Sequence, residues 1–427
     1  MEQLPFFRLD TGVAPLDVSI VMPCLNEVQS LPHCIANARE ALARIEQAYG
    51  LVGEIVIADN GSTDGSQALA TSLGARVVHV PVKGYGAALI GGASDAYGRY
   101  IIMGDADGSY DFTDGVAMVG KLIDGADLCM GSRFKGGIAP GAMPWKNRYI
   151  GNPALTGILN LFFRADIDDA HCGLRGLSKA AFQDLGLSGS GMEFASEMVI
   201  KAALKGMRID EVPATLSRDL RDRPPHLRPW RDGWRHLRYL LMLSPTWVFG
   251  IPALLAVSAA SIILGVACLF ALGVLDGPSP FGTSWILIGG YLFTVGHFAA
   301  LMSLATHFYG VRRGYRQLRP WLERLDGALT LENAIVGGLA MMVTSLAALL
   351  VIGLRWSTHG FAALPSILPL TLAAMTGSVG LQTLLGGFLL AITADHSSRL
   401  IPLPAGHPRF VAPPRMLTNH ADRVPAA

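Results

Sequence analysis

The sequence predicts an α/β domain with a mainly parallel sheet, followed by a region of four membrane-spanning helices. Short apolar runs alternate with helix-like stretches from Val18 to Leu243, which is the pattern of strand–helix–strand units. Four much longer apolar runs follow Pro245. Charged residues make up 16% of the 427 residues and the mean hydropathy is +0.39, whereas a typical soluble protein has roughly 25% charged residues.

Five short apolar runs are the expected strands of the first part. The polar or glycine-rich segments after the first, second and fourth runs, at residues 23–26, 59–64 and 104–109, would follow the carboxyl ends of their strands. Open parallel sheets bind their ligands at these ends. The expected strands are Val18–Met22, Glu54–Ala58, Arg76–Val80, Tyr100–Met103 and Asp127–Met130.

The long apolar runs can each cross a bilayer, because a spanning helix needs about 20 apolar residues. They lie at residues 247–275, 284–311, 334–354 and 366–394. The connection between the second and third runs is rich in arginine, and arginine-rich connections stay in the cytoplasm. We therefore expect a multi-pass protein of the cell (inner) membrane, with its first domain and both termini in the cytoplasm. The arginines are Arg312, Arg313, Arg316, Arg319 and Arg324.

The cysteines and the first residues agree with this location. The chain has five scattered cysteines, an odd number, without a Cys-x-x-Cys pair or zinc-finger spacing. A disulfide framework is therefore not expected, and a reducing compartment is favoured. Residues Met1 to Asp10 lack the basic segment and apolar core of a signal peptide. We expect that the first half of the chain is not exported.

Asp105 and Asp107 follow an apolar strand, in a turn that contains Gly104 and Gly108. In an extended segment, residues two apart point the same way. Two such carboxylates can bind a hard divalent cation, which would bridge to a diphosphate and neutralise the charge on a nucleoside diphosphate leaving group. An isolated Asp-x-Asp is more often an ordinary surface turn, so the surrounding motifs decide its interpretation.

This turn is one of five ordered motifs in the first part of the chain. Together they resemble family-2 glycosyltransferases of the GT-A fold, in the branch of the dolichol- or polyprenyl-phosphate mannose and glucose synthases. The resemblance covers roughly the first 245 residues and implies a Rossmann-like catalytic domain. The motifs are Val18–Glu27, Glu54–Ser66, Lys83–Ala88, the Asp105 turn and Gly131–Phe134.

The resemblance assigns the donor side of a site. Pro23, Asn26 and Glu27 would line the nucleoside pocket, and Asp59 would meet the base. Gly84 would allow the backbone to approach the ligand closely, which only glycine permits at low cost. Helix capping and turn formation are the alternative for Asn26 and Asp59, and they are compatible with binding.

The same resemblance implies a metal, Mg²⁺ or Mn²⁺. Asp105 would contact the ribose or the metal, and Asp107 would be the principal metal ligand. Ser109 would also lie near the metal, at a position where related enzymes often have Gln or another polar residue. This departure from the family pattern leaves the role of Ser109 open.

Arg133, Arg148 and Arg175 are the expected acceptor side. The segment Asp168–Arg175 resembles the Asp-x-x-(Ser/Cys)-Gly-x-Arg element of the same branch. Arginine suits a phosphate because its planar fork donates two hydrogen bonds at once. Ordinary surface charge is the alternative for each arginine. Glu193 and Glu197, one helical turn apart, fit salt bridging or helix capping at least as well as catalysis.

The segment 218–238 interleaves arginine with tryptophan and proline directly before the first long apolar run. Basic residues with aromatics can bind nucleic acid, but this position favours a lipid surface. We expect an amphipathic interface helix at 229–245, and no nucleic-acid partner. The resemblance adds a mobile basic loop near Arg218–Arg228.

The domain plan is then a transferase domain at 1–228, the interface helix at 229–245, the spans within 246–395 and a poorly ordered tail at 396–427. The resemblance implies inverting transfer of a sugar from a donor of UDP-glucose or GDP-mannose type to undecaprenyl or dolichyl phosphate. A processive polysaccharide synthase, and a transport or scaffold protein with a degenerate transferase domain, are the alternatives. A monomer and a homo-oligomer both remain open.

Overall fold

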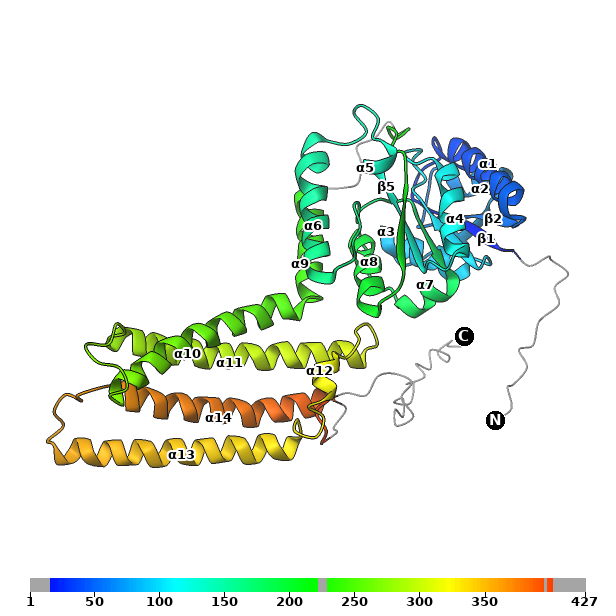
Figure 1. Cartoon of the computed structure of the whole chain (residues 1–427). Coiled ribbons are helices and arrows are strands. Elements are labelled where there is room, and N and C mark those ends of the chain that lie inside the picture. The colour runs from blue at the N-terminus through cyan, green and yellow to red at the C-terminus, as the bar shows by residue number, and fades with distance from the viewer. Residues whose placement is uncertain (1–15, 222–228, 395–397, 402–427) are drawn as a thin grey trace, which may run out of the picture. The chain divides into compact units, whose positions relative to one another are not determined.

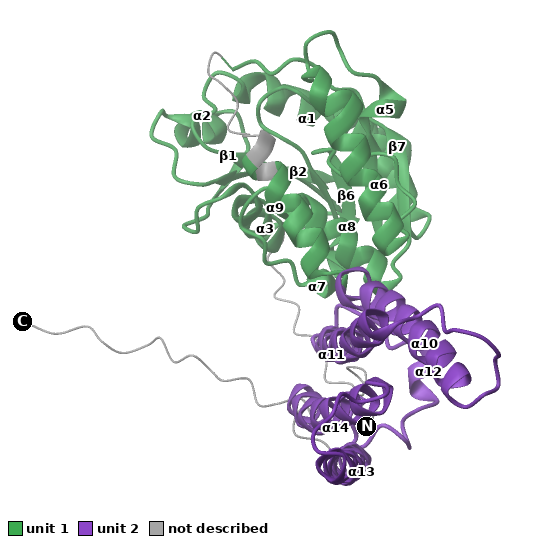
Figure 2. Ribbon diagram, turned by 90° about the vertical axis from the view of Figure 1, so that its left-hand side faces the viewer, with its two compact units in different colours: residues 1–244 green, residues 245–427 purple. Residues whose placement is uncertain are grey.

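The computed structural model describes residues 16–221, 229–394 and 398–401 (Figure 1). The chain forms two compact units, Met1–Ser244 and Pro245–Ala427, which Figure 2 distinguishes by colour. Of the expected mobile loop, residues 222–228 lie outside the described residues. The same holds for the expected tail, apart from residues 398–401.

A seven-stranded sheet forms the centre of the first unit, in the order β3-β2-β1-β4-β6-β5-β7. Neighbouring strands are parallel except for β6, which runs antiparallel to β4 and β5. The predicted mainly parallel sheet is confirmed. The strands are β1 Val18–Cys24, β2 Gly53–Asp59, β3 Arg76–His79, β4 Tyr100–Met103, β5 Leu128–Ser132, β6 Arg175–Ser178 and β7 Ile209–Pro213.

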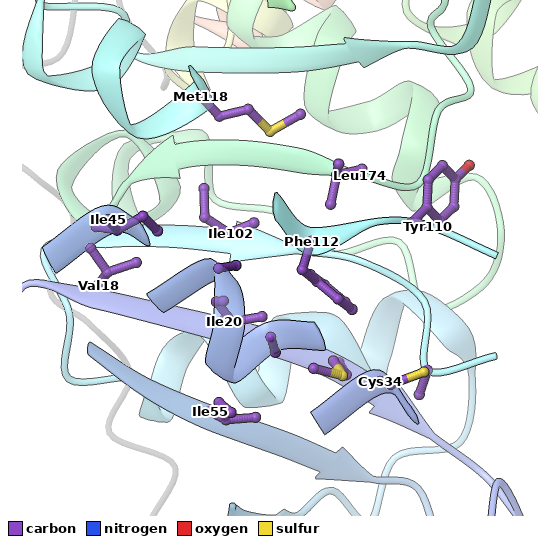
Figure 3. Packing of buried hydrophobic residues seen from close by; sticks show 14 of the residues in the cluster. Val18, Ile20, Cys34, Ile45, Ile55, Ile102, Tyr110, Phe112, Met118 and Leu174 are labelled. Atoms are coloured by element: carbon purple, nitrogen blue, oxygen red, sulfur yellow. The ribbon is translucent and has the colours of Figure 1, made fainter. Parts of the chain in front are cut away.

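Helices cover both faces of this sheet. The buried side chains of its strands point alternately to the two faces and belong to two separate apolar clusters. Along β1, Ile20 and Met22 belong to the first cluster and Val21 to the second. Figure 3 shows part of the first cluster, where Ile102 of β4 lies near Phe112. This period of two is what a strand buried on both faces requires.

The helices α1 and α4 contribute to the first cluster, and α3, α6, α7, α8 and α9 to the second. These three layers leave the carboxyl ends of β1, β2 and β4 at one edge of the sheet. The helices of this unit are α1 Leu31–Tyr49, α2 Ser66–Ser72, α3 Tyr85–Asp95, α4 Gly115–Ile123, α5 Arg133–Gly136, α6 Asn152–Phe163, α7 Lys179–Leu185, α8 Phe194–Lys205 and α9 Pro229–Met242, with the short helices η1 Phe112–Asp114 and η2 Asn147–Gly151.

Among the described residues of the second unit, four helices are long and apolar enough to cross a membrane. The prediction of four helices that can span a membrane is therefore confirmed by their length and composition. Gly338 and Gly380 meet where α13 packs on α14, since a Cβ on either would lie 2.7 Å from the carbonyl oxygen of the other. Small residues of this kind let membrane helices approach closely. The elements are η3 Thr246–Gly250, α10 Ile251–Ala271, α11 Thr283–Arg312, α12 Pro320–Glu323, α13 Leu331–Thr358 and α14 Leu368–Thr393.

Candidate active site

Asp105 and Asp107 lie directly after β4, where the backbone leaves the sheet. Asp107 is 6% exposed, and its Oδ1 accepts the Ser109 amide at 2.9 Å. Burial and the Asp107 carboxylate raise the pKa of Asp105 to about 7, against the lowering effect of a hydrogen bond from Tyr85. Part of this rise in pKa comes from the repulsion between the two carboxylates. A cation between them would stabilise their charged forms.

A cation from the protein itself lies against this turn. The Arg221 guanidinium pairs with the carboxylates of Asp107 and Glu27. The segment that carries Arg221 is held to the turn by backbone hydrogen bonds from Leu220 to the Asp107 carbonyl and from Ser217 to the Ser109 carbonyl, both 2.8 Å. Glu27 and Asp107, which are 80 residues apart in sequence, thus share one positive partner.

These residues fit a hard divalent cation. The carboxylate oxygens are the ligands that Mg²⁺ and Mn²⁺ prefer, and Mg²⁺ commonly takes only one or two carboxylates together with waters and substrate phosphates. Among the described residues, no group of three or more His, Cys, Asp and Glu side chains is arranged to hold a metal alone. Asp105 and Asp107 would therefore hold a metal jointly with the phosphates of a ligand.

The loops after β1 and β2 are tied to each other beside this turn. The backbone amide of Asn26 donates to Ser62 Oγ at 2.9 Å, and the side-chain Oδ1 of Asn26 accepts the backbone amide of Thr63 at 2.8 Å. Asn26 has a φ of +60°, a left-handed conformation that asparagine tolerates better than most residues. Pro23 lies next to these loops, within β1 and opposite Ala58 of β2. The structure thus brings together the predicted nucleoside-binding residues of the first strand.

Asp59 is fully buried and organises the second loop. Its carboxylate accepts the amides of Gly61 at 2.9 Å and Ser62 at 3.1 Å, and the side-chain amide of Gln67 at 2.6 Å. Burial alone would raise the pKa of Asp59, but these hydrogen bonds lower it below its usual value. The turn-forming role that was the alternative for Asp59 is therefore present. Its contact with a base stays a prediction.

Asn60 is a residue that the sequence analysis did not single out. Its side chain donates to the carbonyls of Val80 and Val82 and accepts the Gly84 amide at 2.8 Å. Gly84 has a φ of +134°, and a Cβ there would lie 2.1 Å from the Ser190 carbonyl oxygen. Asn60 thereby sets the start of α3, whose first residue, Tyr85, reaches Asp105. The available signal was its place in the motif Glu54–Ser66, directly after Asp59.

Arg133 and Arg175, which the sequence assigns to the acceptor, are buried and bonded within the protein. Arg133 pairs with the fully buried Asp169 at 2.6 and 2.7 Å. Arg175 donates to the carbonyls of Cys172, Ala195 and Ala170. Both guanidiniums therefore brace the segment 169–175. Their direct contact with a phosphate stays a prediction.

Arg148, Glu193 and Glu197 have partners outside the segment 169–175. Arg148 is half-buried in η2, and its guanidinium lies over the Tyr149 ring at 5.5 Å from the centroid. Glu197 is fully buried, pairs with Lys201 at 2.7 Å and accepts the Gly189 amide at 2.7 Å, so it has the salt-bridging role. Glu193 Oε1 accepts the Gly191 amide at 3.0 Å.

Comparison with known proteins places this geometry in a family. The model of glycosyl transferase family 2 matches residues 19–186, and the model of the family-2 C-terminal transmembrane region matches residues 304–394. The chain is 35% identical over 386 residues to the low-salt glycan biosynthesis hexosyltransferase Agl6 of Haloferax volcanii, covering 89% of this chain and 90% of that one. The chain belongs to glycosyltransferase family 2. The GT-A fold and the glycosyltransferase activity expected from the sequence are confirmed.

Other similar proteins match about half of this glycosyltransferase. The polyprenol monophosphomannose synthase of Mycolicibacterium smegmatis is 26% identical over 211 residues, covering 46% of this chain and 76% of that one. A dolichyl-phosphate hexose transferase of Haloferax volcanii is 27% identical over 197 residues, covering 46% and 81%. Glucosyl-3-phosphoglycerate synthase of Mycobacterium tuberculosis, solved with Mn²⁺ and UDP-glucose, has a TM-score of 0.41 at 20% identity, covering 54% and 79%.

Gly84→Ala in this glycosyltransferase should lower both stability and activity, because the new Cβ meets the Ser190 backbone and φ is positive. Strain of this kind costs about 1–3 kcal/mol, to which the contact with the backbone adds. Gly65→Ala is the matched control, since its φ is +90° but a Cβ there meets nothing within 4 Å. Thermal unfolding of the two variants in detergent measures the difference. Equal midpoints would show that the close approach at Gly84 is unimportant.

Arg133→Ala should destabilise the transferase domain strongly, because it leaves the Asp169 carboxylate buried without its partner. Breaking a buried ion pair from one side costs about 3–5 kcal/mol. Arg148→Ala, which removes a half-buried arginine, should change the unfolding midpoint little. Unfolding midpoints of both variants test this, and a stable but inactive Arg133→Ala would instead support the predicted phosphate contact.

Proposed function

We propose that this glycosyltransferase transfers one hexose, with inversion, from a nucleotide-sugar to the phosphate of a polyprenyl phosphate at the cytoplasmic face of the membrane. The main support is that the chain joins two features: a turn of carboxylates, one of which pairs with Arg221, and four helices of bilayer length. A water-soluble acceptor needs no such helices. The names of two similar proteins, a dolichyl-phosphate hexose transferase and a polyprenol monophosphomannose synthase, support the acceptor class.

The chemistry of a lipid phosphate suits the residues in the site. A phosphomonoester has its second pKa at about 6, so it is already a dianionic nucleophile at neutral pH and needs no general base. A metal held by Asp105 and Asp107 would neutralise the charge that develops on the leaving nucleoside diphosphate. The protein then contributes positioning and charge stabilisation, and the two loops tied by Asn26 would orient the nucleoside.

The surface of the catalytic unit supports a lipid partner. Exposed apolar and aromatic side chains occur on α9, where Trp234 and Met242 are 59% and 70% exposed, and on η2, where Tyr149 and Ile150 are 67% and 57% exposed. The exposed Arg231 and Arg238 also lie on α9. Tryptophan, tyrosine and arginine together are typical of a protein surface that lies at the membrane–water boundary.

The test is a transfer assay with the purified full-length chain and Mg²⁺ or Mn²⁺. Donors are UDP-glucose, GDP-mannose and their common epimers, and acceptors are undecaprenyl phosphate, dolichyl phosphate and, as a soluble comparison, 3-phosphoglycerate. We expect metal-dependent transfer to a lipid phosphate from one donor. Transfer to 3-phosphoglycerate alone would overturn the acceptor assignment.

A processive polysaccharide synthase is the second candidate, and it makes a different product. Synthases of that kind carry a Gln-x-x-Arg-Trp motif, which this sequence lacks. The two candidates separate by the number of sugars on each acceptor molecule. We expect one.

A further inference from the structure

A buried polar contact fixes α9, the last helix of the catalytic unit, against α8. Ser196 Oγ of α8 lies 2.8 Å from Nδ1 of His236 in α9 and 3.5 Å from Nε2 of His171. The two imidazole rings pack edge to face, with centroids 4.8 Å apart and planes at 88°. Ser196 is fully buried and His236 is 6% exposed. Residues from three separate segments therefore meet at one hydroxyl group.

A serine beside a histidine at this distance can be a nucleophile with its base. Burial rules out that use here, because Ser196 is 0% exposed and no substrate can reach its Oγ. The contact instead fixes the position of α9 against α8. Apolar packing of Leu240 would hold α9 in place in several registers, whereas a buried hydrogen bond has one good geometry and is costly to leave unmade.

The contact leads directly to the segment braced by Arg133 and Arg175. His171 lies between Asp169, the partner of Arg133, and Cys172, whose carbonyl accepts from Arg175. Arg175 also donates to the carbonyl of Ala195, the residue before Ser196. The segment 169–175 is thus held on one side by the two arginines and on the other by the helix that precedes the spans.

His171 is suited to accept or share a hydrogen bond in this network. Burial, His236 and the charges of Arg133 and Arg175 hold the pKa of His171 well below its usual value, so the ring is neutral at neutral pH. Its Nδ1 is buried and, within the described residues, has no hydrogen-bond partner. The orientation of the His171 ring therefore depends on its contacts with Ser196 and His236.

We propose that His236 is a positioning residue for the acceptor: through Ser196 and His171 it sets the segment 169–175 in the arrangement that receives the lipid phosphate. The inference rests on the proposed transfer to a polyprenyl phosphate and on the predicted acceptor role of the segment 169–175. It assigns α9 a role beyond anchoring, because the position of this helix is then transmitted to the acceptor side of the site and not to the nucleotide loops.

The test compares three substitutions of His236 in the full-length enzyme. His236→Asn places an amide where Nδ1 lies and keeps the bond to Ser196, whereas His236→Gln places it nearer to Nε2 and His236→Phe keeps only the ring. The Gln and Phe variants lose the buried hydrogen bond to Ser196, so we expect their KM for undecaprenyl phosphate to rise roughly tenfold. The Asn variant should stay close to the wild type, and the KM for the nucleotide-sugar should not change in any of them.

Three outcomes would overturn the inference. The Phe and Gln variants could match the wild type, the Asn variant could be as impaired as they are, or the KM values for both substrates could rise together, as general destabilisation would cause. If the Phe variant does not fold, the comparison of Asn with Gln still decides. Ser196→Ala combined with His236→Phe should be no worse than either change alone, because both break one interaction.

The two proposals fail in different ways. A wild-type enzyme that transfers no sugar to undecaprenyl phosphate or dolichyl phosphate removes the proposed function and this inference with it. A wild-type enzyme that does so, with unchanged kinetics in the His236→Phe and His236→Gln variants, removes the positioning role alone.

Discussion

Asp107→Asn should abolish sugar transfer while the protein stays folded and in the membrane. The change removes the charge next to the cationic partner and leaves the side-chain shape, so Asp107 could no longer hold a metal against the leaving diphosphate. Removing one preorganised electrostatic contact commonly costs 10²–10³-fold in kcat, or about 3–4 kcal/mol. We expect a loss of at least that size, measured as initial rates with the donor and acceptor identified for the wild type.

Asp111→Asn is the matched control for Asp107→Asn. Asp111 lies four residues further along the same segment, but its carboxylate caps η1 through the Thr113 amide and accepts from Asn37. Its substitution should lower stability modestly, by about 1 kcal/mol, and leave kcat nearly unchanged. Full activity of Asp107→Asn, or equal losses in the two variants, would contradict the assignment of the metal turn.

Arg221→Gln should tighten metal binding in the absence of donor and, at the same time, slow transfer. The single positive charge of Arg221 pairs with both Asp107 and Glu27 in this structure, so its guanidinium would compete with a metal for Asp107 Oδ2. Without that competing charge, we expect the affinity for Mn²⁺ alone to rise about tenfold, since even a partly screened charge at this range is worth about 1–4 kcal/mol. The displaced guanidinium can pair with diphosphate oxygens, so its loss should reduce kcat.

Titration of Mn²⁺ into the purified chain, with and without UDP or GDP, measures this exchange. Arg218→Gln is the control variant, because Arg218 is a nearby exposed arginine whose Nε donates to the Pro140 carbonyl and not to a carboxylate. Unchanged or weaker Mn²⁺ binding in Arg221→Gln would show that the guanidinium does not compete with the metal.

The geometry of the predicted donor side follows closely from the sequence, because it depends on local patterns. Polar residues after apolar runs predict the loops at the ends of β1 and β2, and the pairing of Cys24 with Asp59 brings these ends together. The position of Asp105 and Asp107 after β4 follows from the same reasoning. A parallel sheet places such ends side by side without information on distant contacts.

The contacts of the predicted acceptor residues could not be derived in this way, because their partners are distant in sequence. An arginine read from sequence can bind a phosphate or brace the protein, and the choice depends on partners such as Asp169 for Arg133. Arg221 and Asp107 are separated by 114 residues, and no local pattern connects them. The strands β6 and β7 were both missed. Arg175–Ser178 of β6 has no apolar run, and only its two neighbouring strands make it a strand. The strand β7, Ile209–Pro213, contains Asp210 and Glu211 and lies at the edge of the sheet beside β5.

The mass of the lipid product shows whether this glycosyltransferase adds one hexose to a lipid phosphate. Full-length enzyme, the active nucleotide-sugar, Mn²⁺ and undecaprenyl phosphate should yield undecaprenyl phosphate heavier by one hexose unit, together with one equivalent of nucleoside diphosphate. Chelation of the metal or the change Asp107→Asn should remove this product. A lipid that carries several sugars, a lipid diphosphate sugar with release of nucleoside monophosphate, or an unmodified lipid beside a glycosylated soluble acceptor would contradict the account.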